Sequence, residues 1–416
     1  MKQKHFSKDF RLVIIGQIIS LFGNAAIRFA LPLYLLNITG SSALYGTVTA
    51  CAFIPTIMLS PVGGIIADRV NKRNIMVILD FFTAAVIIVF SLLMSIVNIV
   101  ILLTIALMLL YGIAGAYQPS VQASIPALVS KESYVTANSV ISAVSSLANL
   151  LGPVLGGVLY SVYGLMPVLL VCIVCFILSA VMEIFIKIPF EKQASNGGVL
   201  SVAKKDFSES ICFIYKEKPI IGKGLLIVCT INLFMSSMII VGLPYLVTEV
   251  LSFDSQLANQ LCGYAQGALA VGGLAGGICA GVFGKKLNIR KAGNLLAVCA
   301  FSVFPMGISL ALFSYSELNY IVITVCCMII MAFSTIFTIQ MMSFVQTETP
   351  QYLIGKVYSV IITVCMCAQL VGSALYGFLF EFCSGFEYIV VLFSGVVSLI
   401  VAWCTKGLFK TLPNTN

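Results

Sequence analysis

Charged side chains are scarce in this sequence. Of its 416 residues only 9 % are Asp, Glu, Lys or Arg, whereas 60 % are hydrophobic, and the mean hydropathy is +1.09. Soluble domains carry about 25 % charged and 45–50 % apolar residues, so this composition excludes a soluble globular protein. A transmembrane helix takes about 20 apolar residues, which leaves room for roughly a dozen spans and little else.

The residues on which most hydrolytic and metal chemistry depends are nearly absent. His5 is the only histidine and lies in the amino-terminal tail, which excludes a histidine-based metal site or catalytic triad. The 14 cysteines are scattered through apolar stretches without metal-ligand spacing, so we expect small apolar residues and no disulfide. A phosphate-binding loop is missing as well. We therefore expect no enzyme activity, no cofactor and no metal.

Apolar runs separated by charge, Gly and Pro predict twelve membrane helices. The amino terminus lacks a small-residue cleavage site after its apolar stretch, so we expect a retained first helix and not a signal peptide. The predicted ranges are 10–37, 43–67, 74–96, 98–124, 134–163, 165–188, 219–249, 256–284, 291–315, 317–346, 353–382 and 386–408.

The distribution of Lys and Arg predicts the orientation. With twelve spans and a cytoplasmic amino terminus, the basic runs at 2–11, 69–73, 187–223 and 285–291 all fall on the cytoplasmic side. The predicted outer loops carry acids instead. The net charge of +8 is therefore a topology signal and does not indicate nucleic acid.

The chain contains an internal repeat. Residues 148–160 align with residues 368–380, and the one long polar stretch, 189–218, lies between the two copies. We expect a six-helix bundle over 1–188, a cytoplasmic linker over 189–218 and a second bundle over 219–416. Two such pseudo-symmetric halves in parallel orientation are typical of secondary transporters.

The turn between the second and third predicted helices carries a recognisable motif. It places Gly64, Asp68, Arg69 and Arg73 in a Gly-x-x-x-Asp-Arg-x-x-x-Arg pattern, which resembles the signature loop of the major facilitator superfamily. The resemblance implies that Asp68 latches the two halves at the cytoplasmic side by meeting the start of the eleventh helix near Lys356. A plain charged cytoplasmic turn is the alternative interpretation.

Two further segments indicate which branch of the superfamily this sequence resembles. Gly152, Pro153, Gly156 and Gly157 in the fifth predicted helix resemble the segment that marks drug and proton antiporters in this superfamily, although Ala148 replaces a family glycine. A glycine-rich packing seam is the alternative. The opening at 22–41 is similar to the branch that holds macrolide-efflux proteins and siderophore exporters.

Arg28 is the most informative single residue because a cation inside a membrane span is expensive and marks a functional site by default. On the first helix of a facilitator fold it would face the central cavity and bind an anionic group of a substrate. Asn24, one turn earlier, would share its face. The alternative is a structural Arg that reaches helix-end carbonyls or headgroups.

Proton coupling needs a titratable group, and the candidates are Asp80 and Glu183. Both lie inside predicted spans but toward the cytoplasmic end, so an interfacial or latch-network role is the alternative. Further candidates for substrate binding are polar and aromatic residues on the helices expected to line the cavity, each of which could instead be helix-packing contacts. They are Tyr111, Asn232, Phe234, Gln266, Phe337 and Gln340.

These features together predict a twelve-helix, all-α membrane transporter that works by alternating access. Proton-coupled export of amphipathic or hydrophobic compounds is the leading expectation. The alternative is transport of an anionic lipid-like molecule or a small metabolite in either direction. We expect a monomer in a bacterial plasma membrane, with a small-molecule substrate, protons and the lipid bilayer as its partners.

Overall fold

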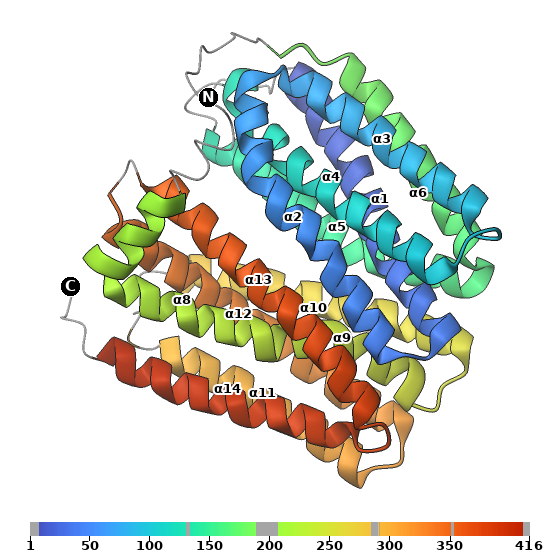
Figure 1. The fold of residues 1–416 in the computed structure, drawn as a ribbon, viewed down its shortest axis with the longest axis vertical. Helices are drawn as coiled ribbons and strands as arrows, with labels where there is room; N and C mark the ends of the chain where they lie inside the picture. Colours follow the sequence, from blue (N-terminus) through green and yellow to red (C-terminus); the bar gives the residue numbers. More distant parts are fainter. Residues whose placement is uncertain are drawn as a thin grey trace. The chain divides into compact units, whose positions relative to one another are not determined.

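The computed structural model describes residues 8–129, 134–188, 207–283, 290, 292–350 and 353–410 (Figure 1). Within these ranges every regular element is a helix, and twelve helices are long and apolar enough to cross a membrane. The predicted all-α membrane fold is therefore confirmed. The first six helices are α1 (Lys8–Thr39), α2 (Ser42–Arg69), α3 (Lys72–Leu93), α4 (Ile99–Leu128), α5 (Tyr134–Tyr163) and α6 (Leu165–Ile184).

The later helices are less regular. Residues 207–212 are helical and lead through a π-helical turn, η2 (Phe213–Glu217), to the seventh span, in which π-helical segments interrupt the α-helix. That span comprises α8 (Pro219–Ile231), η3 (Asn232–Ser236), α9 (Ser237–Tyr245) and η4 (Leu246–Val250). The remaining spans are α10 (Ser255–Phe283), α11 (Ala292–Leu312), α12 (Ser316–Glu348), α13 (Ile354–Phe382) and α14 (Glu387–Lys410).

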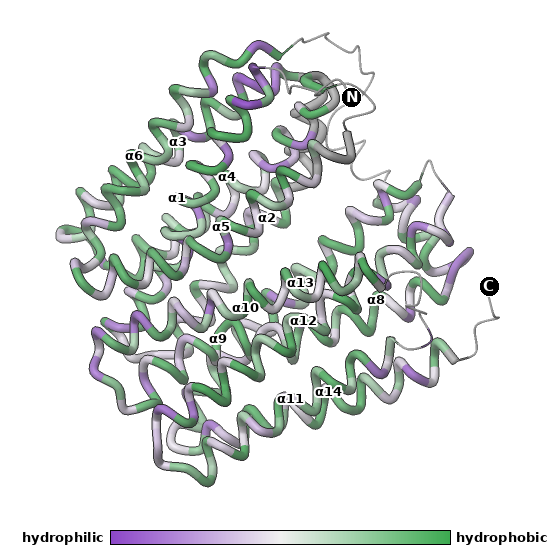
Figure 2. The backbone as a smooth tube through the Cα atoms, turned by 180° about the vertical axis from the view of Figure 1, so that it is seen from behind, coloured by the Kyte–Doolittle hydropathy of each residue, from purple (hydrophilic) through white to green (hydrophobic). Residues whose placement is uncertain are grey.

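Local sequence signals set several helix ends. The side chain of Asn71 accepts a hydrogen bond from the backbone N of Arg73 (3.1 Å), and Asn98 accepts one from Val100 (3.0 Å). Asn is a preferred helix N-cap because its side chain satisfies a backbone donor that the helix cannot. These caps start α3 and α4 within two residues of their predicted positions. Hydrophobic residues dominate the helices between such ends (Figure 2).

The described residues gather into two compact units. The first lies within Met1–Leu35 and Cys51–Ala203, and the second within Leu36–Ala50 and Lys204–Asn416. The predicted division at 188 and 219 stays a prediction, and residues 189–206 of the predicted linker lie outside the described part. The end of α1 and the start of α2 group with the second unit.

Contacts with α13 explain the position of the start of α2. A Cβ on Gly46 would lie 2.5 Å from the carbonyl oxygen of Ser373, so the two backbones approach as closely as glycine allows. The Glu381 carboxylate accepts hydrogen bonds from the Ser41 hydroxyl (2.8 Å) and the Ala43 backbone N (3.1 Å). A carboxylate there satisfies the unpaired donors at the α2 amino terminus and complements the helix dipole.

Glycines also bring α10 and α12 together in the second unit. Cβ atoms on Gly272 and Gly276 would each lie 2.2 Å from a carbonyl oxygen of α12, those of Met328 and Ala332. Small residues at such positions let helices in lipid pack through their backbones. By contrast, nothing lies within 4 Å of a Cβ on the adjacent Gly277.

Adjacent substitutions in α10 should therefore differ in effect. Gly276→Ala is expected to destabilise the purified protein by about 1–3 kcal/mol, because the new methyl group overlaps α12. Gly277→Ala should be neutral or slightly stabilising, since Ala favours helix over Gly and the site is open. Thermal unfolding in detergent measures both. Equal stability of the two variants would contradict the close α10–α12 contact.

Candidate functional site

Six polar side chains from four helices meet inside the first unit, and we call them the acid cluster. Their burial is nearly complete, from 0 to 5 % exposed. They are Gln17 and Ser20 of α1, Asp80 of α3, Tyr117 of α4, and Ser179 and Glu183 of α6.

Short hydrogen bonds join the acid cluster. Gln17 Nε2 donates to Tyr117 Oη (2.6 Å), which in turn donates to Glu183 Oε1 (2.7 Å). The Ser20 hydroxyl donates to Asp80 Oδ1 (3.0 Å). Asp80 and Glu183 are close enough to interact electrostatically. The structure thus brings both predicted acids together and buries them among helices, at 2 % and 0 % exposed.

Backbone and apolar contacts hold the acid cluster in place. Ser179 Oγ donates to the carbonyl oxygen of Gly16 (3.1 Å), and a Cβ on Gly16 would lie 3.6 Å from the Glu183 side chain. Apolar residues of α1, α3 and α4 cover the cluster on the side of Tyr117, among them Phe10 and Met76. The sequence alone did not identify Gln17, Ser20, Tyr117 or Ser179; the only signal was the helical spacing of 17 with 20 and of 179 with 183.

Arg28 forms a second polar site in the first unit. Its guanidinium carbon lies 3.4 Å from the centre of the Tyr111 ring, a cation–π stack between α1 and α4. Thr56 of α2 donates to the Tyr111 carbonyl oxygen (2.9 Å), and the Phe53 ring meets that of Tyr111 edge on (5.5 Å). No carboxylate of the described residues pairs with Arg28, which is partly exposed like Asn24 one turn before it.

The glycines of α5 position α1 beside this site. A Cβ on Gly152 would lie 2.4 Å from the Cβ of Ala25, and one on Gly156 would lie 3.3 Å from the Cα of Ala26. Pro153 lies inside α5, and Gly157 is buried. The segment therefore holds α5 against α1 within one turn of Arg28.

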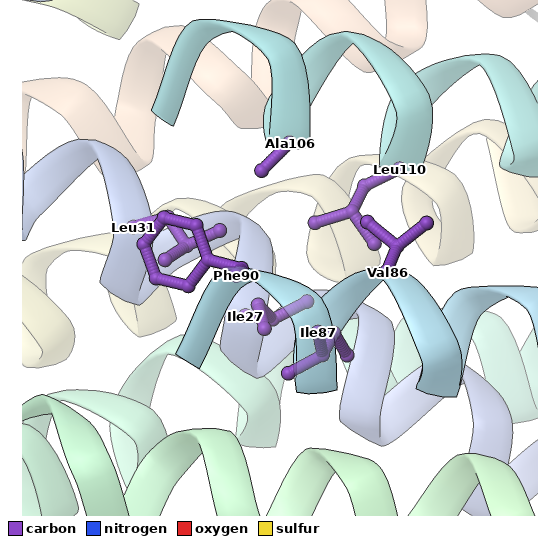
Figure 3. A pocket seen from close by; sticks show the side chains of 7 residues that line it. All are labelled: Ile27, Leu31, Val86, Ile87, Phe90, Ala106 and Leu110. Atoms are coloured by element: carbon purple, nitrogen blue, oxygen red, sulfur yellow. The ribbon is translucent and has the colours of Figure 1, made fainter. Parts of the chain in front are cut away.

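A small apolar gap between α1, α3 and α4 has no room even for a water molecule and so does not fit a substrate (Figure 3). Ligand pockets for drug-sized molecules measure about 300–1,000 Å³ and contain a few polar groups, whereas the side chains around this gap are all apolar. They are Ile27, Leu31, Val86, Ile87, Phe90, Ala106 and Leu110.

The predicted substrate residues of the second unit differ in their surroundings. Asn232 and Phe234 lie in η3. Asn232 Nδ2 donates a hydrogen bond to the Val228 carbonyl oxygen (2.9 Å). The ring of Phe234 packs edge on against that of Phe393, with 6.2 Å between the ring centres. Gln266 of α10 is partly exposed. Phe337 is buried, whereas Gln340 is 8 % exposed and neither atom of its amide has a hydrogen-bond partner.

The predicted latch is described only in part. Gly64, Asp68 and Arg69 lie in the last turns of α2, and their side chains lie outside the described part. Arg73 donates from Nη2 to the carbonyl oxygen of Ile184 at the end of α6.

Lys356, the expected partner of the latch, forms an ion pair with Glu209 (2.8 Å). The latch therefore stays a prediction. Among the described side chains no group of three His, Cys, Asp or Glu could hold a metal ion.

A sequence model of the family described as the Major Facilitator Superfamily matches residues 13–373. The chain belongs to the Major Facilitator Superfamily. It is 24 % identical to Macrolide efflux protein A of Streptococcus pyogenes over 384 residues, which cover 90 % of this chain and 91 % of the relative. It is 32 % identical to Multidrug resistance protein MdtG of Salmonella typhi over 158 residues, 36 % of this chain and 38 % of that protein. The predicted resemblance to the drug-efflux branch of this superfamily is confirmed.

Solved facilitator structures share the fold. The nucleoside transporter NupG superimposes with a TM-score of 0.75 at 11 % identity, covering 98 % of this chain and all of that one. A bacterial homologue of the iron transporter ferroportin superimposes with a TM-score of 0.69 at 18 % identity, covering 95 % of this chain and 98 % of that one. The protein is therefore a multi-pass membrane transporter of small molecules with the twelve-helix facilitator fold.

The effect of an Ala substitution in α5 on transport should depend on the space beside each glycine. Gly152→Ala is expected to impair transport more than Gly156→Ala, because its methyl group overlaps Ala25 and displaces α1 near Arg28, at a cost of about 1–3 kcal/mol. Initial transport rates in vesicles, normalised to protein amount, test the order. If both variants are as active as the wild type, the α1–α5 contact does not position the site.

Proposed function

We propose that this transporter exports amphipathic or hydrophobic compounds in exchange for protons. It works by alternating access as a monomer in the bacterial plasma membrane, with both termini in the cytoplasm.

The observation that carries the proposal is the Arg28–Tyr111 stack. Its cation is partly exposed and lacks a carboxylate partner among the described residues, while the Tyr111 ring meets Phe53 edge on and the Tyr111 backbone carbonyl accepts a hydrogen bond from Thr56. A partly exposed aromatic ring adds apolar surface beside the cation, and the guanidinium offers up to five donors to an oxygen-rich group. A site with both properties suits molecules that are partly apolar and partly polar.

The likeness to named efflux proteins supports the direction. Macrolide efflux protein A of Streptococcus pyogenes aligns with nine-tenths of the chain. The aligned glycine segment of α5 lies against α1, where a packing change would reach the Arg28 site. We assign Asn24 and the exposed part of Gln266 to the same substrate path, and Asp68 and Lys356 to the cytoplasmic latch.

A second candidate function is transport of an anionic lipid-like molecule or a small metabolite, in either direction. Arg28 favours it, because guanidinium binds phosphate and carboxylate through paired hydrogen bonds. The two candidates differ in what they predict for neutral compounds: the second requires an anionic group, whereas drug efflux does not.

Transport by purified protein in proteoliposomes distinguishes these functions. With an imposed pH gradient, wild type is expected to move macrolides and lipophilic dyes against their concentration gradient. Arg28→Ala should lower this rate about ten-fold if a partly exposed cation–π contact of about 1.4 kcal/mol is lost. Arg28→Lys keeps the charge and should retain part of the rate. Lys216→Ala, which removes an exposed charge at η2, is the matched control.

The substrate dependence decides between the candidates. Export by wild type of compounds without an anionic group, such as macrolides, supports drug efflux, and loss of anionic compounds alone in Arg28→Ala supports the anionic alternative. If no pH gradient moves any compound and Arg28→Ala equals the wild type, proton-driven drug export is wrong.

A further inference from the structure

The acid cluster contains more buried acceptors than hydrogen bonds to fill them. Oε1 of Gln17, Oδ2 of Asp80 and Oε2 of Glu183 have no hydrogen-bond partner. All three residues are at most 2 % exposed. Buried polar atoms normally have a partner, and one that lacks it carries the full cost of desolvation.

The hydroxyl donors of the cluster are already engaged. The Tyr117 hydroxyl hydrogen is given to Glu183, that of Ser20 to Asp80, and that of Ser179 to the Gly16 carbonyl. A hydroxyl has one hydrogen to give. The hydroxyls therefore leave the second oxygen of each carboxylate without a hydrogen-bond donor.

No cation balances the two acids within the described residues. Arg73, on the same helix as Asp80, directs its guanidinium to the Ile184 carbonyl at the end of α6. Asp9 accepts a hydrogen bond from the Lys187 backbone N near that same end.

Among the described side chains the other helices add no charge to the acid cluster. Tyr117 is the titratable group that α4 directs at the acids, α1 contributes only the uncharged Gln17 and Ser20, and α5 has no charged residue at all. Two adjacent carboxylates in an interior without a counter-ion cannot both stay ionised, and one keeps its proton.

We propose that Asp80 and Glu183 form a proton-binding site and share one exchangeable proton. Binding forms one O–H bond between the proton and a carboxylate oxygen, and release breaks that bond, leaves the electron pair on the oxygen and passes the proton to water. Tyr117 and Ser20 are positioning residues that orient the acceptor oxygens. The coupling role of this proton rests on the proposed antiport; the site itself does not.

Infrared spectroscopy of the purified protein tests the site without any substrate. In pH-difference spectra the wild type should show a protonated carboxyl band that disappears as the pH rises. Asp80→Asn and Glu183→Gln should each remove or displace this band. Asp254→Asn, which changes an exposed acid between η4 and α10, is the matched control and should leave it in place. A band that persists unchanged in both cluster variants overturns the proposal.

Transport assays separate the proton site from substrate binding. Exchange of labelled for unlabelled substrate across the membrane needs no net proton movement, so Asp80→Asn and Glu183→Gln should retain it. Accumulation driven by a pH gradient should be lost in both variants. If the variants still accumulate substrate to the wild-type level, the pair does not carry the coupling proton. If wild type fails to transport drugs while the infrared band behaves as expected, the proposed substrate class is wrong and the proton site stands.

Milder variants keep the test decisive if the acid substitutions prevent folding. Tyr117→Phe removes the hydroxyl that stabilises the Glu183 carboxylate, so the midpoint of the infrared titration should move toward higher pH by about one unit, the equivalent of one hydrogen bond. Ser20→Ala should move it in the same direction through Asp80. A purely structural role for these hydroxyls predicts lower thermal stability with an unchanged midpoint, and that result also overturns the proposal.

Discussion

The contact between α1 and α5 at Ala25 and Gly152 fixes the geometry on which both polar sites of the first unit depend. The two helices approach until no side-chain atom fits at Gly152. Helix α1 then presents Gln17 and Ser20 to the acid cluster and Arg28 to Tyr111, all from one rigid element. A shift of α1 therefore reaches both sites, so this helix would link a substrate bound at the proposed Arg28 site to the buried acids.

The same helix keeps the cation and the acids apart. Ser20 and Arg28 are separated by eight residues, or about 12 Å of helix rise. A direct ion pair between Arg28 and Asp80 is therefore not available, and each group is stabilised differently: the cation by an aromatic face, the acids by hydroxyls. An interior that separates its charges in this way needs protons to balance the acids.

The sequence was sufficient for the fold and for part of the site. Apolar runs of membrane length give the twelve helices because lipid leaves few alternatives, and a carboxylate inside a span is conspicuous, so Asp80 and Glu183 could be identified. The hydrogen-bond partners of these two acids could not be identified from the sequence. Gln17, Ser20 and Ser179 are ordinary polar residues whose role appears only when four helices pack. The π-helical segment that contains Asn232 and Phe234 was also unpredictable, because it depends on the fit of η3 against Gly372 of α13.

The internal repeat equips the two units with similar helices but not with similar chemistry. Among the described residues, Asp80 and Glu183 are the only charged side chains that are buried, and both belong to the first unit. The second unit buries uncharged groups such as Gln340 and joins α10 to α12 through glycine contacts that leave little room for rearrangement. In the proposed proton site, uptake and release depend on the first unit, while the second supplies interrupted helices, a frequent feature of functional sites. A symmetric fold can thus carry an asymmetric mechanism, because helix packing tolerates many sequences whereas a buried acid pair requires specific hydrogen-bond partners.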